Sequence, residues 1–294
     1  MVALPFASLR SGEARISLRR PPALVLSAGW TILSIGLFAG LWELSWAMGW
    51  ANPLLLPPPH LFLSDWDRTL SYFSNANRIG ADASHGGLVG LLATSLYTIL
   101  RVVAGLALGL VAGVAVGALV HYVKLARNLL MPTLLLLTPI SPVAWLPVSI
   151  FLFGIGNTPA IFLVFITIFF AIILSTTAQL EGVSKSYLNV ARIMGASGHQ
   201  IFWRVVFPAI LPGLFMTLRL NLFAAWMVVL IAEAVGVGSG LGQITAVARS
   251  TFNAQLTFFT MALIGVIGFG FDWALRTVQR RMLWWVAPST GGAR

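Results

Sequence analysis

The sequence predicts an all-α membrane protein with about six transmembrane helices. Hydrophobic residues make up 58% of its 294 residues and charged residues only 9%, and the mean hydropathy is +0.91. A soluble domain cannot bury so much apolar surface with so few charges. The apolar residues also gather in long runs separated by short basic segments, and a run of about 20 residues is enough for a helix to cross a bilayer.

Six runs meet that length, at residues 24–48, 91–120, 130–153, 159–180, 208–235 and 255–275. Together they predict a transmembrane domain over 23–285, with a cytoplasmic N-terminal segment over 1–22 and a cytoplasmic C-terminal tail over 286–294. The first run follows an arginine-bearing segment and is too long for a cleaved signal peptide, so we interpret it as an uncleaved signal anchor.

Basic residues are concentrated in every second loop between the spans, and this distribution predicts how the protein is oriented in the membrane. Cytoplasmic loops retain Lys and Arg, so the loops with more of these residues are predicted to be cytoplasmic. This places both termini on the cytoplasmic side of the inner (plasma) membrane. A charge of +10 then reflects orientation rather than nucleic-acid binding. The cytoplasmic set is Arg10, Arg15, Arg19, Arg20, Lys124, Arg127, Lys185, Arg192, Arg204, Arg276, Arg280, Arg281 and Arg294; the external set is Arg68, Arg78 and Arg249; Arg101 and Arg219 fall within spans.

The residue types argue against an enzyme. There is no cysteine and there are four scattered histidines, so we expect no disulfide and no metal site. The only lysines, Lys124 and Lys185, follow no glycine-rich phosphate loop. The spans offer few polar residues to form a catalytic centre. The glycine-rich stretch 236–242, "GVGSGLG", is interpreted as a flexible outer turn.

Glycines recur every four residues in the second span, at Gly105, Gly109, Gly113 and Gly117. Such a stripe lets another backbone approach closely. The approaching helix could belong to the same chain or to a second copy.

Prolines interrupt the third span at Pro132, Pro139, Pro142 and Pro147. Proline removes a backbone donor and kinks a helix. The kinked helix could border a translocation path, with Trp145 lining it, or could pack against neighbouring helices without contacting a solute.

The cytoplasmic loop between the fourth and fifth spans, at about 181–208, predicts two short helices. Residues 184–194 suit the first, Gly195 ends it, and Ser197 with Gln200 has the spacing of a capping box for a second helix through Phe207. Ile201, Phe202 and Val205, next to Arg204, suit docking into a groove of another protein. An amphipathic hairpin lying on lipid headgroups is the alternative.

This loop resembles the coupling loop of ABC-importer permeases, whose pattern is E-A-A, three residues, G, nine residues, I-x-L-P. The sequence has Asn189, Val190 and Ala191, then Gly195, and then Val205, Phe207 and Pro208. Three further stretches, "LLLPPPHLF", "PVAWLPVSIFLFGIGNTPAIFLV" and "LRLNLFAAWMVVLIAEAVGVGSGLG", are similar to the nitrate/sulfonate/taurine/bicarbonate permease group. The coupling residues that the resemblance implies are Asn189, Val190, Ala191, Gly195, Ala196, Ser197, Ile201, Arg204 and Pro208.

The resemblance implies the transmembrane domain of a type I ABC importer. Its subunit would pair with a second copy in the lipid membrane and act with two cytoplasmic ATPase subunits, which bind ATP and magnesium, and with a periplasmic solute-binding protein. The expected solute is small and anionic, of the nitrate, bicarbonate, cyanate, sulfonate or taurine class. The alternative is a secondary transporter or channel that does not use ATP.

Charged residues inside spans are costly and therefore mark candidate sites. Arg219, Trp226 and Glu233 recur every seven residues, close to Asn221, and with Trp145 they are the candidate translocation-path residues. Arg219 could bind an oxyanion through paired N–H donors. It could instead form an ion pair with Glu43 or Glu233. Asp272 and Arg276, at i and i+4, predict a separate ion pair.

Overall fold

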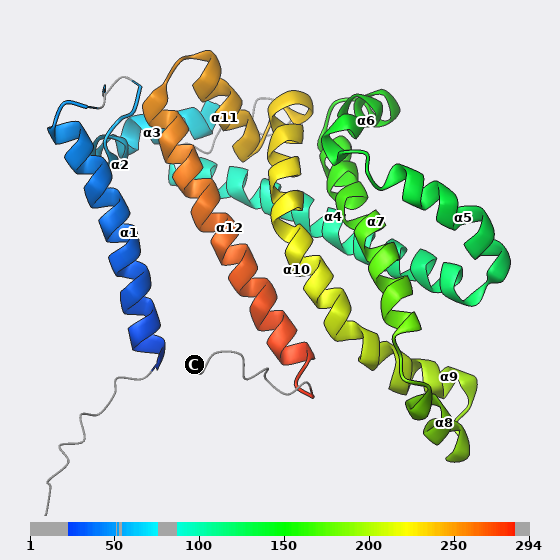
Figure 1. The fold of residues 1–294 in the computed structure, drawn as a ribbon. Coiled ribbons are helices and arrows are strands. Elements are labelled where there is room, and N and C mark those ends of the chain that lie inside the picture. The colour runs from blue at the N-terminus through cyan, green and yellow to red at the C-terminus, as the bar shows by residue number, and fades with distance from the viewer. Residues whose placement is uncertain (1–22, 51, 53–54, 76–86, 286–294) are drawn as a thin grey trace, which may run out of the picture. The chain divides into compact units, whose positions relative to one another are not determined.

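The computed structural model describes residues 23–50, 52, 55–75 and 87–285, and all regular structure within them is helical (Figure 1). The chain divides into two compact units, Met1–Pro59 and His60–Arg294. The first unit contains α1 (Ala23–Ala47), which coincides with the first predicted span. The predicted tails over 1–22 and 286–294 lie outside the described residues.

The second unit contains four helical stretches long and apolar enough to cross a membrane, or five if a bent pair counts as one span, among the described residues. The four are α4 (Leu88–Tyr122), α7 (Asn157–Glu181), the continuous stretch Gly198–Val237 and α12 (Ala254–Met282). They correspond to the second, fourth, fifth and sixth predicted spans. The stretch Gly198–Val237 consists of α9 (Gly198–Ile201), η2 (Phe202–Val206), α10 (Phe207–Ala232) and η3 (Glu233–Val237); the remaining elements are α2 (Pro59–Ser64), α3 (Trp66–Asn75), α5 (Lys124–Leu137), η1 (Pro142–Trp145), α6 (Leu146–Phe153), α8 (Lys185–Ile193) and α11 (Leu241–Ser250).

The third predicted span is not one kinked helix. Helix α5 starts earlier than predicted, and the chain breaks at residues 138–141 before η1 and α6, with an angle of 98° between the two parts. Pro139 lies in the break and Pro142 opens η1, so two backbone donors are missing where the helix would have continued. The prolines therefore bend the chain far more sharply than a kink within a span.

The glycine stripe of α4 packs against α7 of the same chain. A Cβ atom added at Gly109, Gly113 or Gly117 would meet Ile168, Ile172 or Thr176 at 3.1 Å or less. The residue numbers rise together on both helices, so α4 and α7 run parallel. The helix that approaches the glycines could have belonged to this chain or to a second copy, and in the structure it belongs to this chain.

Substituting Val for Gly113 is therefore expected to destabilise the second unit by about 1–3 kcal/mol, the usual cost of overpacking a tight contact. The added Cβ would lie 2.8 Å from the Cβ of Ile172, so the two helices must separate. Gly265→Val on α12 is the matched control, because no atom lies within 4 Å of its added Cβ. Thermal unfolding in nanodiscs checks this; equal stability of the two variants would contradict it.

Helix α10 lies between α7 and α12 and runs antiparallel to both. The Ser175 hydroxyl lies 2.7 Å from the Thr217 hydroxyl, and a Cβ at Gly213 would meet the side chain of Gln179. On the other side, Trp226 stacks on Phe271 at 6.2 Å between ring centroids. A buried apolar cluster joins α4, α5 and α7: Val120, Leu134, Ile166, Phe170 and Ile173.

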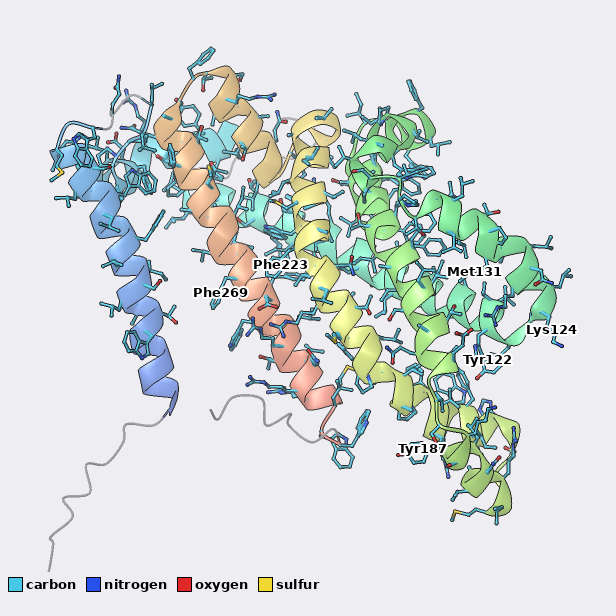
Figure 2. All side chains as sticks on the ribbon, in the orientation of Figure 1. Tyr122, Lys124, Met131, Tyr187, Phe223 and Phe269 are labelled. Atoms are coloured by element: carbon cyan, nitrogen blue, oxygen red, sulfur yellow. The ribbon has the colours of Figure 1, made fainter. Side chains whose placement is uncertain are left out.

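These helix directions bring the end of α4, the α8 and α9 pair and the end of α12 to one end of the second unit, which we call the basic end. Figure 2 labels Tyr122, Lys124 and Tyr187 in this region. Arg68 and Arg249, from the external set, lie on α3 and α11 toward the opposite end. The two charge sets thus separate spatially as they do in the sequence. The described basic residues at the basic end are Lys124, Arg127, Lys185, Arg192, Arg204, Arg276, Arg280 and Arg281.

Candidate functional site

The helix pair α8–α9 is built by local signals at the basic end. The Ser184 side chain accepts a hydrogen bond from the Ser186 backbone and starts α8. Gly195 ends this helix with a φ of 77°, a conformation that glycine adopts without steric cost. Ser197 and Gln200 then form the predicted capping box, with bonds of 2.9 and 3.4 Å. The predicted first helix, the glycine stop and the capping box are confirmed, but the second helix does not end at Phe207, because it continues into α10.

The most exposed apolar residues of this helix pair are not Ile201, Phe202 and Val205, the apolar residues predicted to dock on another protein. Ile193 and Met194 are 85% and 81% exposed, followed by Tyr187 at 64% and Val190 at 55%. By contrast Ile201 is partly buried and faces back toward α4. Of the remaining predicted coupling residues, Asn189, Gly195, Ser197 and Arg204 are exposed, while Ala191, Ala196 and Pro208 are partly buried.

The second short helix continues into the long helix α10 without a break. Helix α9 passes into the π-helical turn η2 and then into α10. Trp203 stabilises this junction, because its ring contacts those of Phe202 and Phe207, each 5.3 Å away between centroids. A load applied to α9 would therefore be transmitted along the membrane-spanning α10 as a packed element.

A second feature is a buried ion pair between α4 and η3. Arg101 and Glu233 are 4% and 0% exposed and lie 2.5 Å apart. The remaining guanidinium donors of Arg101 bind the Asn157 side-chain oxygen at 2.6 and 3.0 Å and two oxygens of Ser239 at 2.7 and 3.0 Å. All five N–H groups of the guanidinium thus have acceptors, as a buried cation requires.

The Glu233 carboxylate is equally well bonded and holds the glycine-rich turn in place. It accepts hydrogen bonds from the Thr98 hydroxyl at 2.8 Å and from the Gly242 backbone at 3.0 Å. The Thr98 hydroxyl also accepts from the Leu241 backbone at 3.1 Å. A Cβ at Gly240 or Gly242 would collide with Glu233. The stretch predicted as a flexible turn is instead fixed to the buried pair.

A third feature is the cluster of Arg219, Asp272 and Arg276 between α10 and α12. Arg219 donates from Nε to one oxygen of Asp272 at 3.0 Å, and Arg276 binds the other oxygen at 2.5 Å. The i,i+4 pair is confirmed. Arg219 pairs with Asp272 of the neighbouring helix. The predicted pair with Glu233 of the same chain is wrong, because Glu233 is held by Arg101 of α4.

Arg219 is the predicted path residue that lines an open cavity. Its side chain is 40% exposed, and within the described residues its two Nη atoms have no hydrogen-bond partner. The cavity measures about 530 Å³ and is otherwise lined by Pro212, Met216, Leu220, Phe223 and Gln279. One carboxylate is thus shared by two guanidinium groups, which leaves a net positive charge beside this cavity.

The other predicted path residues make contacts within the chain, and Trp226 and Glu233 are buried. Trp145 packs against the apolar cluster of α4, α5 and α7. The Asn221 amide donates to the Thr217 carbonyl of its own helix at 2.9 Å. Trp226 is 5% exposed between α10 and α12, and Glu233 is held by Arg101.

Residues 105–284 match the family model for the binding-protein-dependent transport system inner membrane component. The chain belongs to this family. It is therefore the permease subunit of an ABC importer, a membrane transport component rather than an enzyme, and it acts with a binding protein and an ATPase.

The permease is similar to transporters whose solutes are named. It is 30% identical to the taurine transport system permease protein TauC of Escherichia coli over 86% of this chain and 89% of that protein. It is 27% identical to the nitrate import permease protein NrtB of Leptolyngbya laminosa over 81% of both chains. Its fold matches a structure of the MetNI methionine ABC transporter with a TM-score of 0.56 at 22% identity, over 65% of this chain and 95% of that chain.

The Arg101–Glu233 pair of the permease was missed by sequence analysis, which placed Arg101 only inside a span. A usable signal was present, since opposite charges inside apolar spans tend to pair. Counting residues from the predicted span ends would nevertheless have placed the two at different depths. Helix α4 is 35 residues long and extends beyond the predicted span 91–120 by three residues at its start and two at its end, so depth cannot be counted from the apolar run alone.

Proposed function

We propose that this permease works as a homodimer that imports a small oxyanion, of the sulfonate and taurine or nitrate and bicarbonate class. The observation that carries the proposal is the side chain of Arg219, which lines the cavity between α10 and α12 and binds Asp272 through Nε alone. A guanidinium donates two parallel hydrogen bonds to a planar or tetrahedral oxyanion. The solutes named for the two relatives carry a sulfonate or a nitrate group, which supports the same chemistry.

ATP and magnesium are proposed to bind in the partner ATPase, and a periplasmic binding protein to deliver the solute. The test is uptake of labelled taurine, nitrate and bicarbonate into proteoliposomes that contain the permease, its ATPase and its binding protein. Uptake of one of them should require ATP hydrolysis and the binding protein. Equal uptake with a non-hydrolysable ATP analogue would instead indicate a secondary transporter or a channel.

The helix pair α8–α9 is proposed to dock on the ATPase through Ile193 and Met194, which are the most exposed apolar side chains of the pair. An apolar anchor that fills a partner's groove commonly contributes 1–3 kcal/mol to binding. Replacing Met194 with Asp should therefore weaken co-purification of the ATPase on the order of 10-fold or more. Ser186→Asp, which adds the same charge at an exposed position of α8, is the control. Equal ATPase recovery from both variants would contradict the proposed contact.

The orientation with both termini in the cytoplasm is proposed from the positions of the basic residues. Because the chain has no cysteine, single cysteines report on it directly. A cysteine at Ser197, on the helix pair, should react with an impermeant maleimide only in inside-out vesicles. A cysteine at Ser250, at the end of α11, should react only in intact spheroplasts. Labelling of both positions from one side would refute this orientation.

A further inference from the structure

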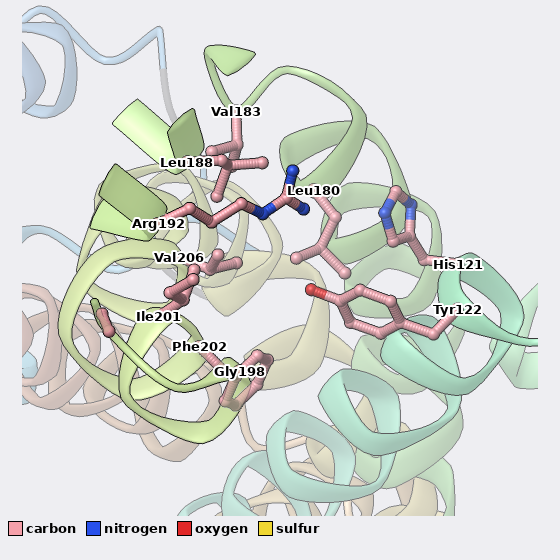
Figure 3. Close-up of a pocket in the computed structure, with 11 residues that line it drawn as sticks. His121, Tyr122, Leu180, Val183, Leu188, Arg192, Gly198, Ile201, Phe202 and Val206 are labelled. Atoms are coloured by element: carbon pink, nitrogen blue, oxygen red, sulfur yellow. The ribbon is translucent and has the colours of Figure 1, made fainter. Parts of the chain in front are cut away.

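A cavity of about 490 Å³ lies behind the helix pair, where the end of α4 meets α8 and η2 (Figure 3). Its walls come from five elements: α4, the end of α7, α8, α9 and η2. This volume is within the range of sites that hold small organic molecules. The face that carries Ile193 and Met194 is separate, since neither residue lines this cavity.

The lining combines one cationic group with apolar walls. Figure 3 shows the guanidinium of Arg192 and the hydroxyl of Tyr122 pointing into the same space. The apolar walls include Leu180, Leu188 and Phe202. None of the lining residues is acidic, and the described residues supply no ion-pair partner for Arg192.

Two further observations favour an anion in this space. His121 also lines the cavity, and within the described part of the chain its buried Nδ1 atom has no hydrogen-bond partner. Glu181, which adjoins the lining residue Leu180, is already paired with Arg127 at 2.8 Å. The cavity is thus a place where a cation and polar atoms lack partners, and buried polar groups are normally hydrogen-bonded.

We propose that this cavity is a binding site for a small organic anion, with its acid group paired with Arg192 and Tyr122 and a short apolar body against Leu180, Leu188 and Phe202. A carboxylate or sulfonate with four to six carbons has this chemistry. The site differs from the Arg219 cavity, because no residue lines both.

Such a ligand would join the membrane helix α4 to the helix pair. Because α8 and η2 supply part of the walls, movement of the helix pair relative to α4 would change the shape of the site. Occupancy is therefore inferred to restrain that movement and to slow coupled ATP hydrolysis. This regulatory consequence rests on the proposed function, whereas binding itself does not.

The test uses a single cysteine at Val183, which lines the cavity near Arg192 (Figure 3). The assembled transporter in phosphatidylcholine nanodiscs, without ATP, is labelled with the anionic sulfonatoethyl or the cationic trimethylammonioethyl methanethiosulfonate. A cysteine at the exposed Ser186 gives the intrinsic ratio of the two rates. At Val183→Cys, the ratio of the anionic to the cationic labelling rate should be several-fold higher than at Ser186→Cys. Hexane-1-sulfonate should slow labelling at Val183→Cys but not at Ser186→Cys.

Adding Arg192→Gln should remove the anionic preference and weaken protection by hexane-1-sulfonate at least 10-fold. Adding Lys185→Gln, which removes a positive charge from the same helix outside the cavity, should leave both unchanged. Equal effects of the two changes would overturn the proposal. Protection by phosphatidylglycerol in the nanodisc, without the sulfonate, would also overturn it and assign the site to lipid headgroups. Since no transport is measured, failure of the import proposal would leave this result unaffected.

Discussion

Replacing Arg101 with Met is expected to destabilise the permease by about 3–5 kcal/mol, the usual cost of leaving one member of a buried ion pair alone. Glu233 would remain 0% exposed with no cation nearby, and Asn157 and Ser239 would lose their donors. Arg101→Lys should restore little of the lost stability. The single nitrogen of an ammonium group cannot reach all three partners as the planar guanidinium does. The measurement is the fraction of monodisperse protein that survives heating in detergent.

The control is Arg127→Met, which breaks an ion pair that is about half exposed on both sides. Exposed pairs contribute about 0–1 kcal/mol, so this variant should behave nearly like the unmodified protein. The double variant Arg101→Met, Glu233→Leu should recover part of the loss, since it leaves no uncompensated charge. Similar survival of Arg101→Met and Arg127→Met would show that the buried pair does not hold the helix α4 to the turn at 239–242.

Features set by neighbouring residues in the chain were predictable from the sequence. The helix pair α8–α9 is an example, since the Gly195 stop and the Ser197–Gln200 capping box act within a few residues. The Asp272–Arg276 pair is another, because its spacing on one helix fixes the contact. Apolar length likewise located α1, α4, α7, α10 and α12.

Features set by contacts between distant segments were not predictable. The seven-residue spacing correctly placed Arg219 and Trp226 on one face, which packs against α12. The same spacing failed for Glu233, because this residue opens the π-helical turn η3 and is held by Arg101 of α4. Prolines in the third span predicted a kink, but the structure has a break at residues 138–141 with an angle of 98° between the two parts. The spacing of charges along one helix does not reveal which neighbouring helix supplies the partner.

Replacing Arg219 with Gln is expected to lower kcat/KM for anion uptake about 10- to 100-fold while leaving the permease assembled. Hydrogen bonds to a charged group contribute about 1.5–3 kcal/mol, which gives this range. Assembly should survive because Asp272 keeps its pair with Arg276 at 2.5 Å. The measurement is ATP-dependent uptake into proteoliposomes, normalised to the amount of monodisperse transporter.

Arg276→Gln is the matched control, because it removes the other guanidinium from Asp272 but Arg276 does not line the cavity of Arg219. If Arg219 serves only to balance the charge of Asp272, the two variants should lose similar stability. Adding Asp272→Asn should then restore the stability of the Arg219→Gln variant. If Arg219 favours the passing anion, only Arg219→Gln should reduce uptake, and Asp272→Asn should not restore it. Full uptake by a stable Arg219→Gln permease would exclude both roles, because neither the ion pair nor the free Nη atoms would then matter for transport.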